Sequence, residues 1–392
     1  MWKGIASGGF TLIIGILVVI AAMIGWGRNE FSKPGPLVAP ICLQVERGAS
    51  ISAVSRYLQE RGAITDARVF RIGADYTDLA DDLKFGSYMI AANASMVEVL
   101  QTVTAGGRST CGRDLNFRIG VTRSDVVLSE LDLATNNFVE VAKFDAGIEV
   151  LPPEYLQVAD DPDLRFRVTV AEGVTSWQVT DALKKADFLT GALETVPTEG
   201  TLAPDSYEVE RGAERGALIA EMTARQSAIL AAAWEARAAD LPYDTAEEAL
   251  IMASIVEKET AVPDERGQVA SVFINRLRQG MRLQTDPTVI YGITKGESVL
   301  GRGLRQSELR RETPWNTYLI DGLPPTPIAN PGRLAIEAAM KPDTTDYIFF
   351  VADGTGGHAF AITLEEHNQN VARWRAIEAA QGTEGEGGVQ GE

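Results

Sequence analysis

One uncharged apolar run near the N-terminus constrains the architecture of this chain more than any other feature. It extends from Phe10 to Trp26 and reads FTLIIGILVVIAAMIGW. Its length is about the minimum that allows a helix to cross the hydrocarbon core of a bilayer. A cleaved signal peptide is the alternative, but the run is long for such a peptide and the following RNEFSKPG contains no small-x-small cleavage site. We therefore expect a cytoplasmic segment at 1–9 and a single transmembrane helix at 10–27.

The charges beside this run do not decide its orientation. Lys3 and the N-terminal amine lie on one side, and Arg28 and Lys33 lie on the other. The formal net charge of the chain is −18, and the sequence contains no basic stripe with interleaved aromatic residues. Such a chain repels a phosphate backbone, so nucleic acid is excluded as a partner.

The two cysteines, Cys42 and Cys111, belong to no metal-binding motif. Neither lies in a C-x-x-C pair or a Cys/His cluster, so we expect no metal and no other cofactor. In an extracytoplasmic domain they are compatible with one disulfide closing a loop of about 70 residues, worth about 4 kcal/mol. Two unrelated buried thiols are the alternative, and the sequence leaves both open.

Proline and strand-turn-helix patterns divide the region after the apolar run. Three prolines in SKPGPLVAP predict an extended linker at 28–40. A first module is expected at 41–107, because VERGASISAVSRYLQERGAI resembles the later VAEGVTSWQVTDALKKADFL in an internal repeat. The aligned positions are Val45, Gly48, Val54, Leu58 and Ile64 with Val170, Gly173, Val179, Leu183 and Leu189. A chance match between two common strand-turn-helix units is the alternative.

The remaining sequence separates into three parts by pattern. Short β-like runs such as LNFRIGV predict a β-rich insertion of unknown role at 108–165. Helical spacing dominates the second half, notably at 215–239 and 245–260, and predicts a domain at 166–378. The ending GTEGEGGVQGE lacks apolar residues, so we expect a disordered tail at 379–392.

The helix TAEEALIMASIVEKET carries two glutamates near its end. At about 100° per residue, Glu259 projects close to Met252, between Ile255 and Val256, whereas Glu257 projects about 160° away. The two carboxylates therefore cannot share one site. Desolvation on the apolar stripe favours a protonated carboxyl at Glu259, which suits a general acid. The helical wheel alone leaves a solvated surface charge as the alternative, and Glu257 is expected to be structural.

Other nucleophile and cofactor motifs are weak. His358 and His367 are the only histidines, and isolated histidines are more often structural than catalytic. No Ser lies in a G-x-S-x-G elbow, and neither Cys lies beside a His. The GTGGH run lacks the strand-to-helix context of a phosphate loop and predicts a hairpin turn.

Polar and aromatic loop residues follow the glutamate helix in dense clusters, as in GMRLQTDPTVIYG and PWNTYLIDGLPPTPIANPG. Such residues suit the hydroxyl and N-acetyl groups of sugars. Four runs resemble the endolytic murein transglycosylase family of bacteria: MASIVEKETAVPDERGQVASVFINRLRQGMRLQTDPTVIYG, NTYLIDGLPPTPIANPG, YIFFVADGTGGHAF with the following EEHNQNV, and EGTLAPDSYEV, which has Ser206 where the family usually has Thr. The resemblance is dense from Val170 onward and looser from Ile41 to Gly107.

This resemblance implies an α+β fold with an N-terminal transmembrane helix, a LysM-like α/β module and a mixed α/β catalytic domain whose catalytic Glu lies on a helix. It implies a single-pass inner-membrane enzyme with a periplasmic catalytic domain, associated with membrane-bound peptidoglycan synthases. The family's catalytic glutamate is the second one of the E-K-E-T motif, which is Glu259 here. The segment from Arg108 to Arg165 departs from the family pattern.

The implied reaction is cleavage within growing glycan strands of peptidoglycan, which we expect to end their elongation. Glu259 would protonate the glycosidic oxygen and then accept the proton of the attacking C6 hydroxyl, leaving a 1,6-anhydro end; such a role is worth about 10²–10⁴ in rate. We expect Gln284, Asp286, Asn316 and Tyr318 to position the sugar. A non-catalytic glycan-binding scaffold and a soluble cytoplasmic lyase are the competing classes.

Overall fold

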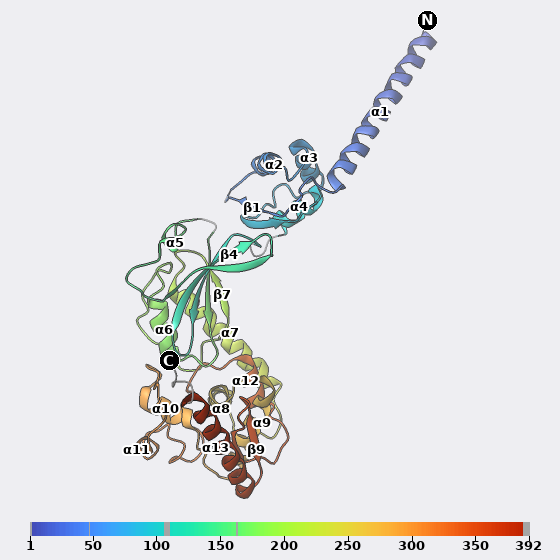
Figure 1. The fold of residues 1–392 in the computed structure, drawn as a ribbon. Coiled ribbons are helices and arrows are strands. Elements are labelled where there is room, and N and C mark those ends of the chain that lie inside the picture. Colours follow the sequence, from blue (N-terminus) through green and yellow to red (C-terminus); the bar gives the residue numbers. More distant parts are fainter. Residues whose placement is uncertain (1, 47, 106–109, 162–163, 387–392) are drawn as a thin grey trace. The chain divides into compact units, whose positions relative to one another are not determined.

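The computed structural model describes residues 2–46, 48–105, 110–161 and 164–386, and the chain forms two compact units (Figure 1). The first unit comprises Met1–Leu115, Leu128–Ala142 and Pro152–Arg165. The second comprises Asn116–Val127, Lys143–Leu151 and Phe166–Glu392. The unit boundaries fall within the segment 108–165, so this segment contributes to both units and is not a separate inserted module.

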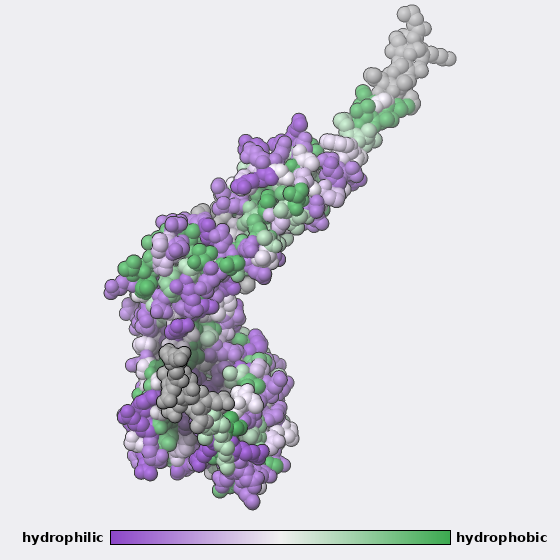
Figure 2. Space-filling view, in the orientation of Figure 1, coloured by the Kyte–Doolittle hydropathy of each residue, from purple (hydrophilic) through white to green (hydrophobic). Residues whose placement is uncertain are grey.

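The N-terminal helix α1 spans Trp2–Ser32, and its stretch Ile14–Ser32 has a mean hydropathy of 1.4. By length and composition this stretch is able to cross a membrane. Its large apolar side chains from Ile14 to Trp26 are exposed, unlike those of a core helix, and this part of α1 is green in Figure 2. The helix extends beyond both ends of the predicted span at 10–27, and Met1 lies outside the described residues.

The segment predicted as an extended linker, 28–40, is instead packed on the first unit. Arg28 continues α1 and donates from Nη2 to the hydroxyl of Tyr76 at 2.9 Å. The ring of Phe31 lies directly against Gly73, where a Cβ atom would meet it at 2.3 Å. Leu37 is only 6% exposed and belongs to the core of the unit. The prolines of the segment 28–40 restrict its backbone as it runs along this core.

Within the first unit, the module from Ile41 to Thr104 runs strand, helix, helix, strand, helix. Its elements are β1 (Ile41–Val45), α2 (Ile51–Glu60), α3 (Ala67–Tyr76), β2 (Gly86–Ile90) and α4 (Met96–Thr104). β1 and β2 pair antiparallel, with Leu43 opposite Tyr88. Both of these side chains are buried, and one face of each helix packs around them. This gives the small module its own hydrophobic core.

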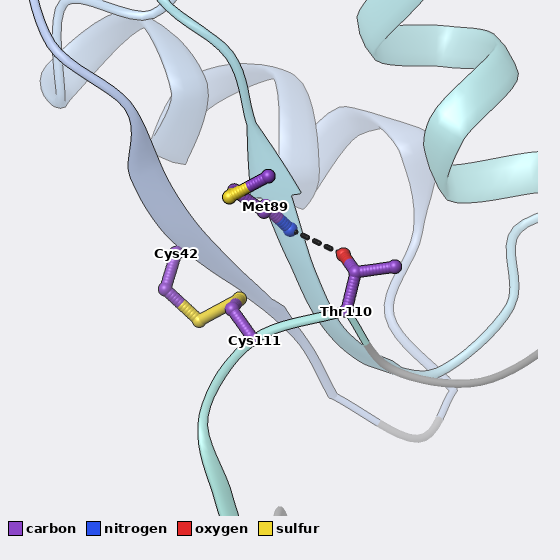
Figure 3. The surroundings of a disulfide bond; sticks show 4 residues. All are labelled: Cys42, Met89, Thr110 and Cys111. Carbon is purple, nitrogen blue, oxygen red and sulfur yellow. Dashed lines mark hydrogen bonds between the residues drawn. A yellow bond between two sulfur atoms is a disulfide. The ribbon is translucent and has the colours of Figure 1, made fainter. Parts of the chain in front are cut away.

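Cys42 and Cys111 form a disulfide with a Cα–Cα distance of 5.8 Å (Figure 3). The neighbouring Thr110 connects the same segment to β2, because its Oγ1 accepts a hydrogen bond of 2.7 Å from the backbone N–H of Met89. The disulfide spans a sequence separation of 69. Of the two alternatives that the sequence left open, the bridge is the one that forms.

The predicted internal repeat corresponds to a strand-turn-helix unit that occurs three times. In each, the last strand residue is followed three positions later by a residue with positive φ and two positions after that by a helix N-cap. The triplets are Val45, Gly48 and Ser50; Ile90, Asn93 and Ser95; and Val170, Gly173 and Thr175. The second triplet was missed because Asn, with a φ of 59°, replaces Gly there.

A five-stranded sheet has the order β5-β4-β3-β6-β7. Its strands are β3 (Arg113–Ile119), β4 (Ser124–Asp132), β5 (Asn137–Asp145), β6 (Arg165–Val170) and β7 (Ser206–Val209). The segment 108–165 is β-rich as predicted, with the short α5 (Pro153–Leu156) near its end. It shares the sheet with β6 and β7, a non-local pairing that local patterns do not reveal.

Helices dominate the rest of the second unit. They are α6 (Ser176–Lys184), α7 (Arg215–Glu235), α8 (Ala246–Glu259), the 3₁₀ turn η1 (Pro263–Glu265), α9 (Arg266–Arg278), α10 (Asp286–Thr294), α11 (Gln306–Leu309), α12 (Arg333–Met340) and α13 (Leu364–Glu386). α8 packs against α7, α9 and α12 in one core (Figure 1). The hairpin β8 (Phe349–Ala352) and β9 (His358–Ala361) confirms the turn predicted at GTGGH.

The C-terminal helix differs from the predicted disordered tail at 379–392. α13 continues to Glu386, and 387–392 lie outside the described residues. The helix passes through Glu378-Ala-Ala-Gln, which are strong helix formers. Adding one residue to an established helix requires little ordering, so a helix can extend into a segment without apolar content.

Candidate active site

The helix α8 is apolar on all sides and fills the centre of the C-terminal core. Thr245 caps it through a hydrogen bond from the Glu248 amide, and Glu248 completes the capping box. All residues from 249 to 256 are buried. A helix with no polar face is surrounded by other elements. A polar side chain at the end of α8 is therefore held in a fixed position.

Glu259 is the last residue of α8, and the following Thr260 is extended. Oε1 of Glu259 accepts a hydrogen bond from the hydroxyl of Thr285, a residue that is 2% exposed. Burial raises the pKa of Glu259 above its usual range, and the charge of Asp286 acts in the same direction. The Thr285 hydrogen bond and the charges of His358 and Arg276 partly oppose this rise. The carboxyl is thus held toward its protonated form, as a general acid requires.

Glu257 faces a different part of the core, as the helical wheel predicted. Its Oε2 accepts a hydrogen bond of 2.9 Å from the Gly332 amide, and Oε1 lies 3.9 Å from Nη2 of Arg266. Burial raises the pKa of Glu257 to about 7. A raised pKa alone therefore does not identify the acid. Glu259 differs from Glu257 in lining the pocket at the end of α8.

This pocket has a volume of about 280 Å³. The end of α8 forms one wall, the β8–β9 hairpin another, and α13 contributes Trp374. The glycines of the hairpin turn leave space in front of Glu259, and Gly354 and Gly356 adopt φ values of 89° and 97° that favour glycine. Glu259 and His358 are the two titratable side chains among the residues that line it.

Asp286 and Tyr318 lie together near Glu259. The Tyr318 hydroxyl donates a hydrogen bond of 2.7 Å to Oδ1 of Asp286, the first residue of α10. Burial raises the pKa of Tyr318, so it stays a hydrogen-bond donor. Asp286 is exposed, and its charge acts on Glu259. Two of the four residues predicted to position the sugar thus form one hydrogen-bonded pair beside the acid.

Asn316 and Gln284, the other two residues predicted to position the sugar, take no part in the hydrogen bond between Asp286 and Tyr318. Asn316 is fully buried, and its Nδ2 donates to the carbonyls of Leu309 and Arg311 at 3.0 and 2.8 Å. Its Oδ1 accepts from the Tyr318 amide at 3.0 Å, so it holds the loop that carries Tyr318. Gln284 is exposed and has a φ of 51°. Its amide donates to the Thr317 carbonyl at 3.1 Å, which fixes the segment before Thr285.

Three residues at the site were not singled out by sequence reasoning. Thr285 precedes Asp286 in the TDP run, and only Asp286 of this run was predicted to position the sugar. Arg276 is 8% exposed; it donates to the carbonyls of Ile348 and Leu283 at 2.7 and 2.6 Å. Its charge also acts on Glu259. His358 was assigned a structural role, and no local signal shows that its hairpin meets the end of α8.

The first unit carries a second pocket, of about 390 Å³. Residues 45–46 and 48–51, at the turn between β1 and α2, form one side, and the segment from Ala80 to Phe85 forms the other. The ring of Phe85 is 53% exposed. Within the described residues, no group of three or more His, Cys, Asp or Glu side chains is placed to hold a metal ion.

Comparison with known proteins agrees with this organisation. The YceG-like family matches residues 149–373. A Bacillus subtilis (strain 168) protein named endolytic murein transglycosylase is 27% identical over 329 residues, covering 83% of this chain and 82% of that protein. A protein of the same name from Streptococcus pneumoniae serotype 2 is 25% identical and covers 92% of this chain and 64% of its own length.

A crystal structure of a yceG-like protein from Listeria monocytogenes is 26% identical. It covers 84% of this chain and 98% of its own, with a TM-score of 0.44. The family match alone spans more than half of the 392 residues, including α8, the Asp286–Tyr318 pair and the β8–β9 hairpin. The chain therefore belongs to the YceG-like family.

Proposed function

We propose that this chain is an endolytic peptidoglycan lytic transglycosylase with Glu259 as its proton-transferring residue. The observation that carries the proposal is a desolvated carboxyl at the end of a buried helix, opening onto a pocket. The names of the two relatives support the same reaction. The bond cut is the one between N-acetylmuramic acid and N-acetylglucosamine within a growing strand, and the cut ends elongation of that strand.

A single carboxyl suffices for this chemistry because the substrate supplies the nucleophile. Protonated Glu259 gives its proton to the glycosidic oxygen as the bond to the anomeric carbon breaks. The C6 hydroxyl of the same muramic acid then attacks that carbon and closes a 1,6-anhydro ring. Its proton goes to a base, and in the simplest scheme this base is the Glu259 carboxylate.

Asp286 and Tyr318 are the residues that we propose to position the sugar and to stabilise positive charge at the anomeric carbon. Their mutual hydrogen bond fixes both side chains next to Glu259. An exposed carboxylate stabilises an oxocarbenium-like carbon without forming a covalent bond. Gln284 is exposed and free to contact a more distant sugar. Asn316 acts through Tyr318, since its own amide is buried.

The first unit is proposed to hold the glycan strand as a LysM-like module at 41–107. Its order of strand, two helices and strand, with β1 and β2 antiparallel, supports this assignment. The pocket between the β1–α2 turn and the Ala80–Phe85 segment offers polar backbone groups and an exposed aromatic ring. Such a combination suits a sugar face.

We propose that α1 anchors the chain in the inner membrane and that both units are periplasmic. The exposed apolar surface of α1 supports the anchor. The Cys42–Cys111 disulfide supports the orientation, because structural disulfides persist in oxidising compartments. Membrane-bound peptidoglycan synthases are the proposed partners, a suggestion that rests on family resemblance alone.

Digestion of purified peptidoglycan by the full-length protein in detergent tests this function. Mass spectrometry of the products should find new 1,6-anhydromuramoyl ends. New reducing ends without anhydro ends would mean that water is the nucleophile, as in hydrolases with two carboxylates. Retention of glycan without any new ends would favour the non-catalytic scaffold.

A further inference from the structure

His358 and Glu265 form an oriented pair on the wall of the Glu259 pocket. Glu265 ends η1, and His358 begins β9, 93 positions later. Oε2 of Glu265 lies 2.8 Å from Nδ1 of His358, while Oε1 accepts a hydrogen bond of 2.9 Å from the His358 amide. Both oxygens of one carboxylate thus hold a single residue. A base whose second nitrogen is held by a carboxylate is a recurring catalytic arrangement.

The pairing determines which ring nitrogen is free. An ionised carboxylate only accepts hydrogen bonds, so Nδ1 carries a proton in this contact. In the neutral ring Nε2 then has a lone pair. Nε2 has no hydrogen-bond partner among the residues that the structure describes, and the side chain remains 15% exposed. His358 therefore presents a proton acceptor at the pocket that Glu259 also lines.

The rings around His358 fix its orientation. Phe350 lies edge-on to it at 5.2 Å with an interplanar angle of 87°, and Phe360 lies 6.3 Å away. The charged groups that interact with the imidazole are Glu265 from η1, Glu259 from α8 and Asp353 from the hairpin turn. All three are acidic.

We infer that His358 is a catalytic residue, and that its Nε2 accepts the proton of the attacking C6 hydroxyl. The inference rests on the proposed function and assigns one of its steps. Glu259 loses its proton to the glycosidic oxygen, the bond from this oxygen to the anomeric carbon breaks, and the bond from C6 oxygen to that carbon forms. The hydroxyl proton passes to Nε2. Glu259 ends as a carboxylate and His358 as an imidazolium, and proton transfer between them restores the start.

This division of roles removes a difficulty of the single-carboxylate scheme. There, Glu259 has to donate a proton on one side of the scissile bond and accept another within the same turnover. Two groups on one pocket can act together, each in the protonation state that it holds before the reaction. The active form has Glu259 protonated and His358 neutral, so the plot of rate against pH should be bell-shaped.

The test compares His358→Ala with wild type in the full-length protein, counting 1,6-anhydro ends against time and pH. We expect kcat to fall by about 10²–10⁴, the range for loss of a general base. The limb of the pH–rate profile that belongs to His358 should vanish. Free imidazole should restore activity, and this effect should saturate as the imidazole concentration rises. Glu265→Gln should lower kcat less than His358→Ala does, because one of the two oxygens that hold His358 is replaced by an amide nitrogen.

His367→Ala is the matched control, since this histidine stacks on Phe349 at 5.0 Å and does not line the pocket. It should keep the wild-type profile. If His358→Ala unfolds, His358→Gln keeps a donor for Glu265 and should show the same loss of a limb. If wild type produces anhydro ends and both His358 variants keep the wild-type dependence of rate on pH, the inference about His358 is wrong. The proposed function would then still stand. Absence of anhydro ends from wild type would overturn the proposed function with it.

Discussion

The hydroxyl of Thr285 donates a hydrogen bond to Oε1 of Glu259, so the residue that precedes α10 is bonded to the residue that ends α8. Thr285 is itself fixed, because its amide donates to the Thr317 hydroxyl at 3.0 Å. This chain of contacts sets the direction of the Glu259 carboxyl. It also joins the two loops that carry Asp286 and Tyr318.

Replacement of Thr285 by Val should change both the rate and its pH dependence. Val has a similar shape but donates no hydrogen bond. The bond stabilises the carboxylate, so its loss raises the pKa of Glu259 further, and the limb of the profile that belongs to this acid should move to higher pH. The rate at the optimum should fall by about tenfold, corresponding to roughly 1.4 kcal/mol of lost positioning. A profile identical to wild type would contradict this role.

Asn316→Ala should lower stability more than it lowers binding of the substrate. The change leaves the carbonyls of Leu309 and Arg311 and the amide of Tyr318 without their partner in a buried site. Buried unsatisfied groups cost about 1–3 kcal/mol each, so we expect a loss of about 2–4 kcal/mol in urea unfolding. Gln284→Ala is the matched control and should unfold as wild type, since this side chain is exposed.

The Cys42–Cys111 bridge should be present in the native protein and should stabilise the first unit. Thiol labelling without reductant should find no free cysteine. The double change of both residues to Ser should lower the free energy of unfolding by about 2–4 kcal/mol, given a loop of this length. Labelling of both cysteines in the native protein would show that the bridge does not form.

Glu257 should make stability depend on pH. The pKa of Glu257 is raised from 4.5 to about 7 in the folded protein, so the folded state binds the proton more tightly than the unfolded state. The penalty for ionising this buried carboxyl is absent below pH 4.5 and grows as pH rises to about 7. At higher pH it is on the order of 3 kcal/mol. Glu257→Gln removes the penalty, so its stability relative to wild type should improve across this window.

Thermal unfolding of wild type and Glu257→Gln at a series of pH values measures that difference. Gln can still accept the Gly332 amide, so the packing of α12 should be kept. An equal difference in stability at every pH would contradict the assignment of the titration to this residue.

Local periodicity predicted those features that depend on a single element. The separation of Glu257 from Glu259 follows from the geometry of one regular helix, and α8 is regular. The hairpin at GTGGH and the cap at Thr245 are likewise local. Sequence reasoning therefore placed Glu259 correctly on its helix and gave it the buried environment that the structure has.

Features that depend on contacts between distant segments were missed. The segment 108–165 was predicted as an insertion, but its strand β3 pairs with β6 and so places the segment in the same sheet as β7. His358 was assigned a structural role because no pattern links a hairpin turn to the end of a helix so far away in the chain. Asn316 was placed among the sugar-binding residues because its side chain is polar, although the fold buries it completely.

The most direct measurement compares the release of 1,6-anhydromuramoyl ends by wild type, Glu259→Gln and Glu257→Gln under identical conditions. Gln keeps the shape of the side chain but carries no transferable proton. We predict that Glu259→Gln lowers the rate by at least about 10³, the order expected for loss of a general acid, while Glu257→Gln stays within about tenfold of wild type. Anhydro ends from Glu259→Gln at the wild-type rate would contradict the assignment of this residue as the acid.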